Sequence, residues 1–231
     1  MEADRWVPVA LLSETRTGSI VTVQDEGGRE HRGRVLSVEG KTALVRIFEE
    51  LDFPSESSLW ISLLQAVPKW ERMEFVIQKA TELGVQEIIP FTSKRSFAPG
   101  AAGTGQDKSH RWPRAARRAV EQCRRRVEPL VAPCSTLTDA LNGFSADEGL
   151  KLILYEKERT VRLTDLARQP SLEKPRRVAL ACGPEGGFTD EEISFARARG
   201  FVPVRLCGRV LRCETAALAA LSVIQHEWGD L

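Results

Sequence analysis

The stretch that decides the fold reads Ala181-Cys182-Gly183-Pro184-Glu185-Gly186-Gly187-Phe188. A second stretch follows it and reads Leu206-Cys207-Gly208-Arg209-Val210-Leu211-Arg212-Cys213-Glu214-Thr215-Ala216. Each is a glycine-bearing turn at the end of an apolar run and just before a helical pattern. In open α/β sheets ligands bind beyond the carboxyl ends of the strands, where such turns lie. The two turns therefore predict the walls of a small-molecule pocket.

The first turn favours close approach of the backbone to a ligand. Glycine allows positive φ, and Pro184 stiffens the loop. The pattern is neither G-x-G-x-x-G nor a P-loop, which argues against a dinucleotide or a nucleoside triphosphate. From the glycines alone, a strand-to-helix connection without a ligand is the alternative.

The second turn carries a charge pattern that favours an anionic or electron-rich partner. Glu214 is well placed against the dipole of the helix that follows, but Arg209 and Arg212 precede the helix and oppose that dipole. Arginines that merely lie in water are the alternative interpretation.

Composition excludes several classes of protein. The 231 residues are 42% hydrophobic with a formal charge of +1, so net charge favours neither nucleic acid nor membrane. The five cysteines form no C-x-x-C pair, which indicates reduced thiols rather than disulfides or a zinc site. No signal peptide or membrane-length apolar run is visible. We expect a cytoplasmic protein without a metal.

The pattern along the chain predicts two domains, residues 1–66 and 67–231. Residues 19–48 alternate polar and apolar side chains and indicate a small β domain. Strand and helix patterns then alternate, which predicts an α/β fold with a mostly parallel sheet. The expected strands are 59–67, 87–91, 150–154, 177–181 and 201–206, and the expected helices are 72–83, 109–124, 189–200 and 214–227.

Helix 109–124 is strongly basic in a chain whose charge is otherwise balanced. Arg111, Arg114 and Arg118 share one of its faces. This pattern indicates either a solvated face or a footprint for a phosphate backbone.

Separated motifs in one order resemble those of the RsmE family, the 16S ribosomal RNA uridine-N3 methyltransferases. The family's G-P-E-G-G-[FL] is at residues 183–188, and L-G-x-R-[IV]-L-R-x-E-T-A is at 206–216. K-x-x-[KR]-M-E-x-x-[IV]-Q-K-x-x-E-L-G-V is at 69–85, and E-Q-[SC]-x-R is at 121–125. One departure is Cys207, which stands where the family has glycine, with Gly208 one place later.

The resemblance implies a SPOUT-type α/β fold with a C-terminal trefoil knot. It also implies a PUA-like β-barrel RNA-binding domain before it, which is shortened at its N-terminus in this chain. The family binds S-adenosyl-L-methionine (SAM) in the knot, acts as a homodimer and methylates the small ribosomal subunit RNA.

The resemblance also assigns roles to particular residues. Arg212, Glu214 and Thr215 are the expected catalytic residues, with Arg212 stabilising charge on uracil and Glu214 accepting the proton or orienting Arg212. The expected RNA contacts are Arg72, Arg95, Arg125 and Arg209. The expected cofactor contacts are Leu154, Tyr155, Gly183, Pro184, Glu185, Gly186, Gly187, Leu206, Gly208, Leu211 and Ala216.

Two other functions compete with methyl transfer. Cys207 and the short N-terminal domain are compatible with a non-catalytic RNA-binding or ribosome-assembly factor on the same fold. The glycine turns and arginines are also compatible with an enzyme that acts on a small phosphorylated metabolite.

Overall fold

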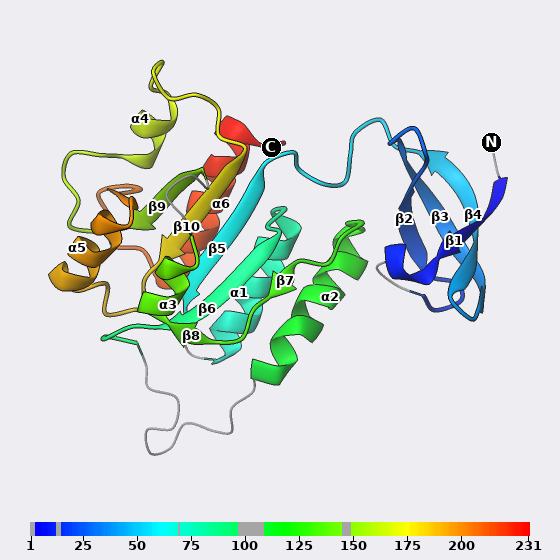
Figure 1. Ribbon diagram of the computed structural model, residues 1–231, viewed down its shortest axis with the longest axis horizontal. Helices are drawn as coiled ribbons and strands as arrows, with labels where there is room; N and C mark the ends of the chain where they lie inside the picture. Colours follow the sequence, from blue (N-terminus) through cyan, green and yellow to red (C-terminus); the bar gives the residue numbers. More distant parts are fainter. Residues whose placement is uncertain (1–2, 13–14, 69, 97–108, 145–148) are drawn as a thin grey trace. The chain divides into compact units, whose positions relative to one another are not determined.

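The larger unit of the protein contains a seven-stranded sheet (Figure 1). The computed structural model describes residues 3–12, 15–68, 70–96, 109–144 and 149–231. The strand order is β11-β9-β10-β5-β6-β7, and β8 also pairs with β6. Every pairing is parallel, which confirms the expected mostly parallel α/β sheet. The strands are β5 (Trp60–Ala66), β6 (Glu87–Thr92), β7 (Leu130–Val131), β8 (Ser135–Thr136), β9 (Leu150–Leu154), β10 (Arg177–Cys182) and β11 (Val202–Val204).

The central strands β5 and β10 are buried along almost their whole length. Strands covered on both faces need near-continuous apolar runs, and both sequences supply them. At one end of this core the rings of Phe91 and Phe188 stack with their centroids 6.2 Å apart. Phe188 ends the first glycine turn and is fully buried, so the core anchors that turn.

Helix α5 begins where the sequence supplies a cap. Thr189 and Glu192 form the capping box at the start of α5 (Asp190–Ala198). Helix α1 (Trp70–Glu82) packs against α6 (Cys213–Trp228), and the Gln225 amide donates to the Leu83 carbonyl at 2.8 Å. The other helices are α2 (Trp112–Cys123), α3 (Leu137–Asn142), α4 (Leu163–Ala167) and the 3₁₀ turns η1 (Val9–Leu11) and η2 (Ser109–Arg111).

The short elements β7, β8, α3 and α4 were not predicted from the sequence. Two-residue strands and helices of five or six residues are too short to produce a recognisable period. Strand β11 is also shorter than expected. It spans Val202–Val204, and the predicted strand spanned residues 201–206.

The smaller unit is a four-stranded antiparallel sheet in the order β1-β4-β3-β2. Its strands are β1 (Ala3–Pro8), β2 (Ile20–Gln24), β3 (Glu30–Glu39) and β4 (Thr42–Glu50). One face buries valine, alanine and isoleucine side chains. Gly33 is required there, because a Cβ would lie 2.4 Å from Val45 Cγ1.

Contacts along the chain divide it differently from the two expected domains. The first unit contains residues 1–57 and 116–128, and the second contains 58–115 and 129–231. Strand β5 therefore belongs with the second unit, and α2 from Ala116 onward belongs with the first. The boundary after residue 66 stays a prediction about domains.

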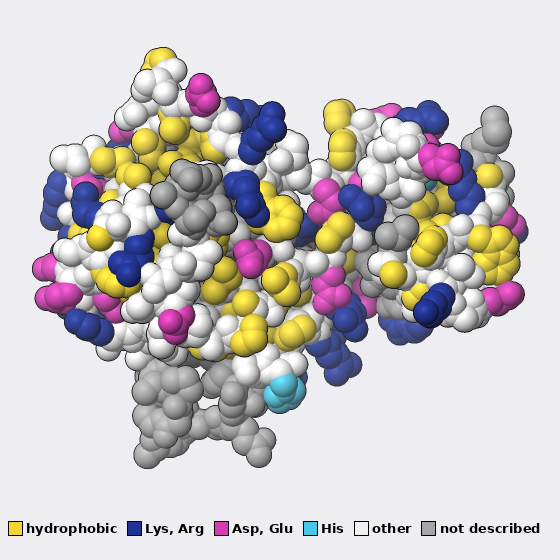
Figure 2. Space-filling model, viewed as in Figure 1, with side chains coloured by type: hydrophobic (Ala, Val, Ile, Leu, Met, Phe, Trp, Pro, Cys, Tyr) yellow, Lys and Arg dark blue, Asp and Glu magenta, His cyan; other side chains and the backbone are white. Residues whose placement is uncertain are grey.

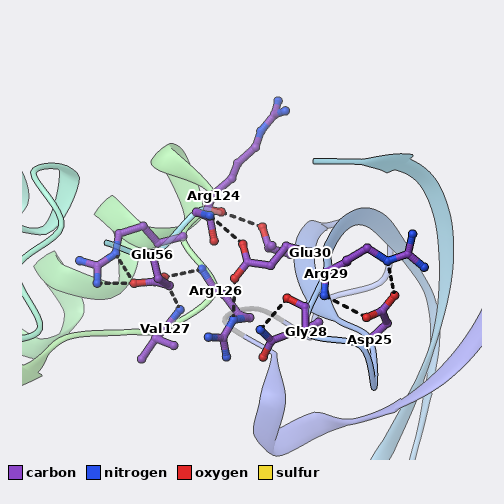
Figure 3. Close-up of polar contacts among 12 residues, drawn as sticks. Asp25, Gly28, Arg29, Glu30, Glu56, Arg124, Arg126 and Val127 are labelled. Carbon is purple, nitrogen blue, oxygen red and sulfur yellow. Dashed lines mark hydrogen bonds and ion pairs between the residues drawn. The ribbon is translucent and has the colours of Figure 1, made fainter. Parts of the chain in front are cut away.

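Glu56 joins residues 125–127 to the rest of the first unit (Figure 3). Its Oε2 accepts from Nε and Nη2 of Arg125 at 3.1 and 2.7 Å, and its Oε1 accepts from the backbone N–H groups of Arg126 and Val127. Arg125 is only 3% exposed. Glu30 in turn accepts from Arg126 Nε at 3.0 Å.

Replacing Glu56 by alanine should therefore destabilise the first unit. The change leaves the buried Arg125 charge without its carboxylate, which costs about 3–5 kcal/mol. Hydrogen exchange of the β3 and β4 amides should become correspondingly faster. Glu26→Ala removes an exposed carboxylate in the same unit and should leave hydrogen exchange unchanged. Equal protection of these amides in the two variants would contradict the stabilising role of Glu56.

Candidate functional site

Three adjacent strands of the second unit end at one edge of the sheet. Strand β9 pairs in parallel with β10 on one side and β11 on the other. The turn at residues 183–188, residues 155–156 and the turn at residues 205–212 follow these strands in order β10, β9, β11. The two glycine turns are thus at the same edge, as predicted, with Leu154 at the end of the strand between them and Tyr155 directly after it.

The first turn is folded tightly and needs its glycines. Gly187 has φ of 67°, and its N–H donates to the Pro184 carbonyl at 2.9 Å. A Cβ on Gly187 would lie 2.8 Å from a carboxylate oxygen of Glu156. The Gly186 carbonyl accepts from Arg95 Nη1 at 3.0 Å. Arg95, an expected RNA contact, therefore lies against the expected cofactor loop.

The second turn leaves open space beside its glycine. No atom lies within 4 Å of the position of a Cβ on Gly208, and Gly208 does not have positive φ. Cys207 also has an ordinary φ, so the residue that departs from the family motif does not strain the backbone. Arg209 and Arg212 are exposed. Leu206, Leu211 and Ala216 are half-buried.

Arg72 of α1 connects the two turns. Its Nη1 lies 3.4 Å from Glu185 Oε1 in the first turn, and its Nε lies 3.8 Å from Glu214 Oε1 at the start of α6. Only about a third of the Arg72 side chain is exposed. An arginine predicted to contact RNA therefore lies between two carboxylates of the site, and sequence spacing gave no sign of this because residues 72, 185 and 214 are far apart in the chain.

Glu214 is an ionised carboxylate. Burial by itself would raise its pKa, but a backbone N–H, the Cys213 thiol and the charges of Arg72 and Arg212 together hold the pKa below its ordinary value. The thiol donates to Glu214 Oε2 at 3.2 Å. A general base works best when its pKa is near the working pH. Glu214 is therefore a poor proton acceptor and well suited to holding a guanidinium in place.

The two cysteines of the site are neutral thiols. Cys182 ends β10 and is fully buried, and burial raises its pKa well above the ordinary value. Burial also raises the pKa of Cys213 to about 12. Neither can supply the thiolate that nucleophilic catalysis by cysteine requires.

Tyr155 is fixed by a second carboxylate that the sequence analysis did not single out. Its hydroxyl donates to Asp190 Oδ1 at 2.6 Å, and Lys157 Nζ lies 3.3 Å from the same oxygen. This hydrogen bond raises the pKa of Tyr155 to about 12. Asp190 is the first residue of α5, so the capping box at Thr189 was the available signal for its position.

Three other expected site residues have different surroundings. Arg125 belongs to the first unit, where its guanidinium forms an ion pair with Glu56. Thr215 lies exposed in the first turn of α6, and Pro184 is buried in the first glycine turn. On the face seen in Figure 2, basic and acidic side chains are interspersed.

No metal-binding group of three or more histidine, cysteine, aspartate or glutamate side chains is present in the described residues. In the same part of the chain, none of the helices has the length and apolar content needed to span a bilayer.

The sequence as a whole matches a known family. The model of the RNA methyltransferase domain family covers residues 55–225. This chain belongs to that family. It is 34% identical over 202 residues to ribosomal RNA small subunit methyltransferase E of Synechocystis, which is 87% of this chain and 64% of that relative, so the chain spans less than two thirds of its length.

Two further matches support membership of the small subunit methyltransferase E group. The protein of that name from Mycobacterium bovis is 30% identical over 235 residues, covering 99% of this chain and 87% of the relative. The crystal structure of the Neisseria gonorrhoeae protein of that name, bound to S-adenosyl methionine, is 33% identical with a TM-score of 0.73. The match covers 100% of this chain and 94% of that one.

Changing Asp190 to asparagine should lower the pKa of Tyr155. Loss of the carboxylate charge removes the interaction that favours the protonated phenol, so the pKa should fall toward about 10. Tyr155 is the chain's single tyrosine, so phenolate absorbance reports it directly. Asp165→Asn serves as the control. Equal titration curves for the parent and Asp190→Asn would contradict the hydrogen bond.

Proposed function

We propose that this protein transfers the methyl group of SAM to N3 of a uridine in the 16S RNA of the small ribosomal subunit. The observation that carries the proposal is the pair of glycine turns at one edge of the sheet, joined through Arg72 and followed by Arg212, Glu214 and Thr215. Membership of the RNA methyltransferase family supports the reaction class.

The residues at this edge fit SAM. Leu206 and Leu211 would offer apolar contacts, and no protein atom opposes a ligand beside the exposed Gly208. Backbone groups of the first turn other than the Gly187 N–H and the Pro184 and Gly186 carbonyls would make polar contacts. Glu156, Glu185 and Glu214 place negative charge around the same edge, which suits a cationic sulfonium. When bound, SAM supplies an electrophilic methyl group. Leu154, Tyr155 and Ala216 would complete its site.

Arg212 would stabilise negative charge on the uracil carbonyl oxygens as the N3 proton leaves. It is the residue immediately before α6, and its charge is one of those that lower the pKa of Glu214. Because its lowered pKa makes Glu214 a weak base, we assign it the orientation of Arg212 and not acceptance of the proton. Thr215 would donate or accept a hydrogen bond beside them. Positioning of this kind supplies a large part of a catalytic rate.

The rest of the proposal concerns RNA and assembly. N3 is paired in a duplex, so the uridine must be unstacked or single-stranded. Arg95 and Arg209 would contact its flanking phosphates, and Arg72 and Arg125 would hold carboxylates in place. We further propose a trefoil knot around the site, a PUA-like first unit, a homodimer and action in the cytoplasm.

The direct test uses small subunits that lack the modification. The protein and SAM are added, and 3-methyluridine is measured by mass spectrometry. Product identifies the reaction. RNA binding without detectable SAM binding and without product would favour the non-catalytic factor. Absence of both RNA binding and product would favour the small-metabolite enzyme.

Arg212→Ala should abolish detectable product. Removing one preorganised donor to a developing oxyanion costs about 10²–10³ in kcat. SAM affinity measured by calorimetry should stay near that of the parent. Arg168→Ala removes an arginine that pairs with Glu227 and provides the control. Near-normal turnover by Arg212→Ala would remove Arg212 from the mechanism.

Gly208→Ala should keep the fold and weaken SAM binding. The added methyl meets no protein atom, so only a bound cofactor can oppose it. Overpacking by one methyl costs about 1–3 kcal/mol, which calorimetry resolves. Gly143→Ala adds a methyl at ordinary contact distance in the same unit and should not change affinity. Unchanged affinity in Gly208→Ala would place SAM elsewhere.

A further inference from the structure

The three consecutive arginines that directly follow α2 have different surroundings in the first unit. Arg125 is buried against Glu56, and Arg126 pairs with Glu30. The Arg124 side chain is exposed and extends away from this hydrogen-bond network (Figure 3). The charges of Arg125 and Arg126 are therefore used within the protein, and that of Arg124 is directed to solvent.

The backbone at Arg124 is unusual. Its φ is 60°, and it is the one residue other than glycine with positive φ in the described part of the chain. A helix that ends in the left-handed conformation normally has glycine there, because a Cβ is unfavourable. Arginine is thus placed at a position whose backbone favours glycine.

Contacts from β2 and β3 hold this conformation. The Arg124 carbonyl accepts from Thr22 Oγ1 at 2.8 Å and from Arg32 Nη1, and Arg32 also donates to Thr22. Thr22 is fully buried, so the arrangement is built into the sheet. The same contacts bring the guanidinium of Arg32 to the chain segment that presents Arg124.

The two guanidinium groups are close enough to affect each other. Burial lowers the pKa of Arg32, and the charge of Arg124 lowers it further. Glu49 lies opposite Arg32 in the β3–β4 ladder. Glu30 is close enough to affect the pKa of Arg32, but its carboxylate forms an ion pair with Arg126. Within the described residues, neither Arg32 nor Arg124 has a carboxylate at ion-pair distance. Arg32 and Arg124 therefore add two positive charges to one segment of the first unit, which suits an anion.

We propose that Arg124, supported by Arg32, binds a backbone phosphate of the RNA substrate on the first unit. The inference rests on the proposed function for the identity of the polyanion. Arg124 makes the contact, and Arg32 is a positioning residue that holds the Arg124 carbonyl and adds charge. A phosphate is favoured over a lone carboxylate because its several oxygens can accept from more than one guanidinium.

The test separates the charge of Arg124 from its backbone. Arg124→Gly and Arg124→Asn remove the charge, and both new residues tolerate the positive φ of this position. Arg124→Lys keeps the charge. Binding of the full chain to a 16S RNA transcript is measured between about 50 and 200 mM salt. Arg29→Gln is the matched control, because Arg29 is exposed in the same unit but already pairs with Asp25 and Glu50.

We expect Arg124→Gly and Arg124→Asn to bind several-fold more weakly, with the slope of log affinity against log salt reduced by about 1. Arg124→Lys and Arg29→Gln should keep the parent's slope. The melting temperature of Arg124→Gly should equal or exceed that of the parent. An unchanged slope in Arg124→Gly, a lower melting temperature, or an equal loss in Arg29→Gln would overturn the inference.

The same samples distinguish this inference from the proposed function. If the parent binds RNA with a steeper salt dependence than Arg124→Gly but forms no 3-methyluridine, the methyl-transfer proposal fails and the phosphate site stands. If the parent forms 3-methyluridine and Arg124→Gly binds as tightly as the parent, the phosphate site fails and the reaction stands. If the parent shows no salt-dependent binding of the transcript, the phosphate site fails.

Discussion

The parallel alignment of β10, β9 and β11 is the constraint on which the site depends. Parallel neighbours end at the same edge of a sheet, so residues 155–156 and both glycine turns meet although they are far apart in the chain. Phe188 then fixes the first turn by burying its ring against Phe91. An antiparallel β9 would send its carboxyl end to the opposite edge and remove Tyr155 and Glu156 from the site.

Charge at this edge is organised around carboxylates as much as around arginines. Arg72 lies between Glu185 and Glu214, and Glu156 lies against Gly187. The lowered pKa of Glu214 keeps its carboxylate ionised. This arrangement explains how exposed Arg212 can precede a helix whose dipole disfavours it: the negative charge of Glu214 in the first turn offsets the unfavourable field.

In the first unit the sequence pattern was a poor guide to which arginines face solvent. Charge spacing on helix 109–124 identified a basic segment but could not tell Arg124 from Arg125, because the difference is made by Glu56, Glu30 and Thr22 from other elements. A buried guanidinium whose donors are taken by a carboxylate stabilises the fold, whereas an unpaired exposed one is available to a partner.

The sequence by itself determined the fold class, the parallel sheet, the capping box at Thr189 and both glycine turns, because these depend on local periodicity and on residues with restricted or permissive backbones. Only the tertiary structure decided that Arg72 joins the two turns, that Tyr155 pairs with Asp190, and that residues 116–128 group with the N-terminal sheet. Those outcomes depend on side chains brought together from distant segments, and one-dimensional spacing does not encode which partner a charge finds when the strands pair.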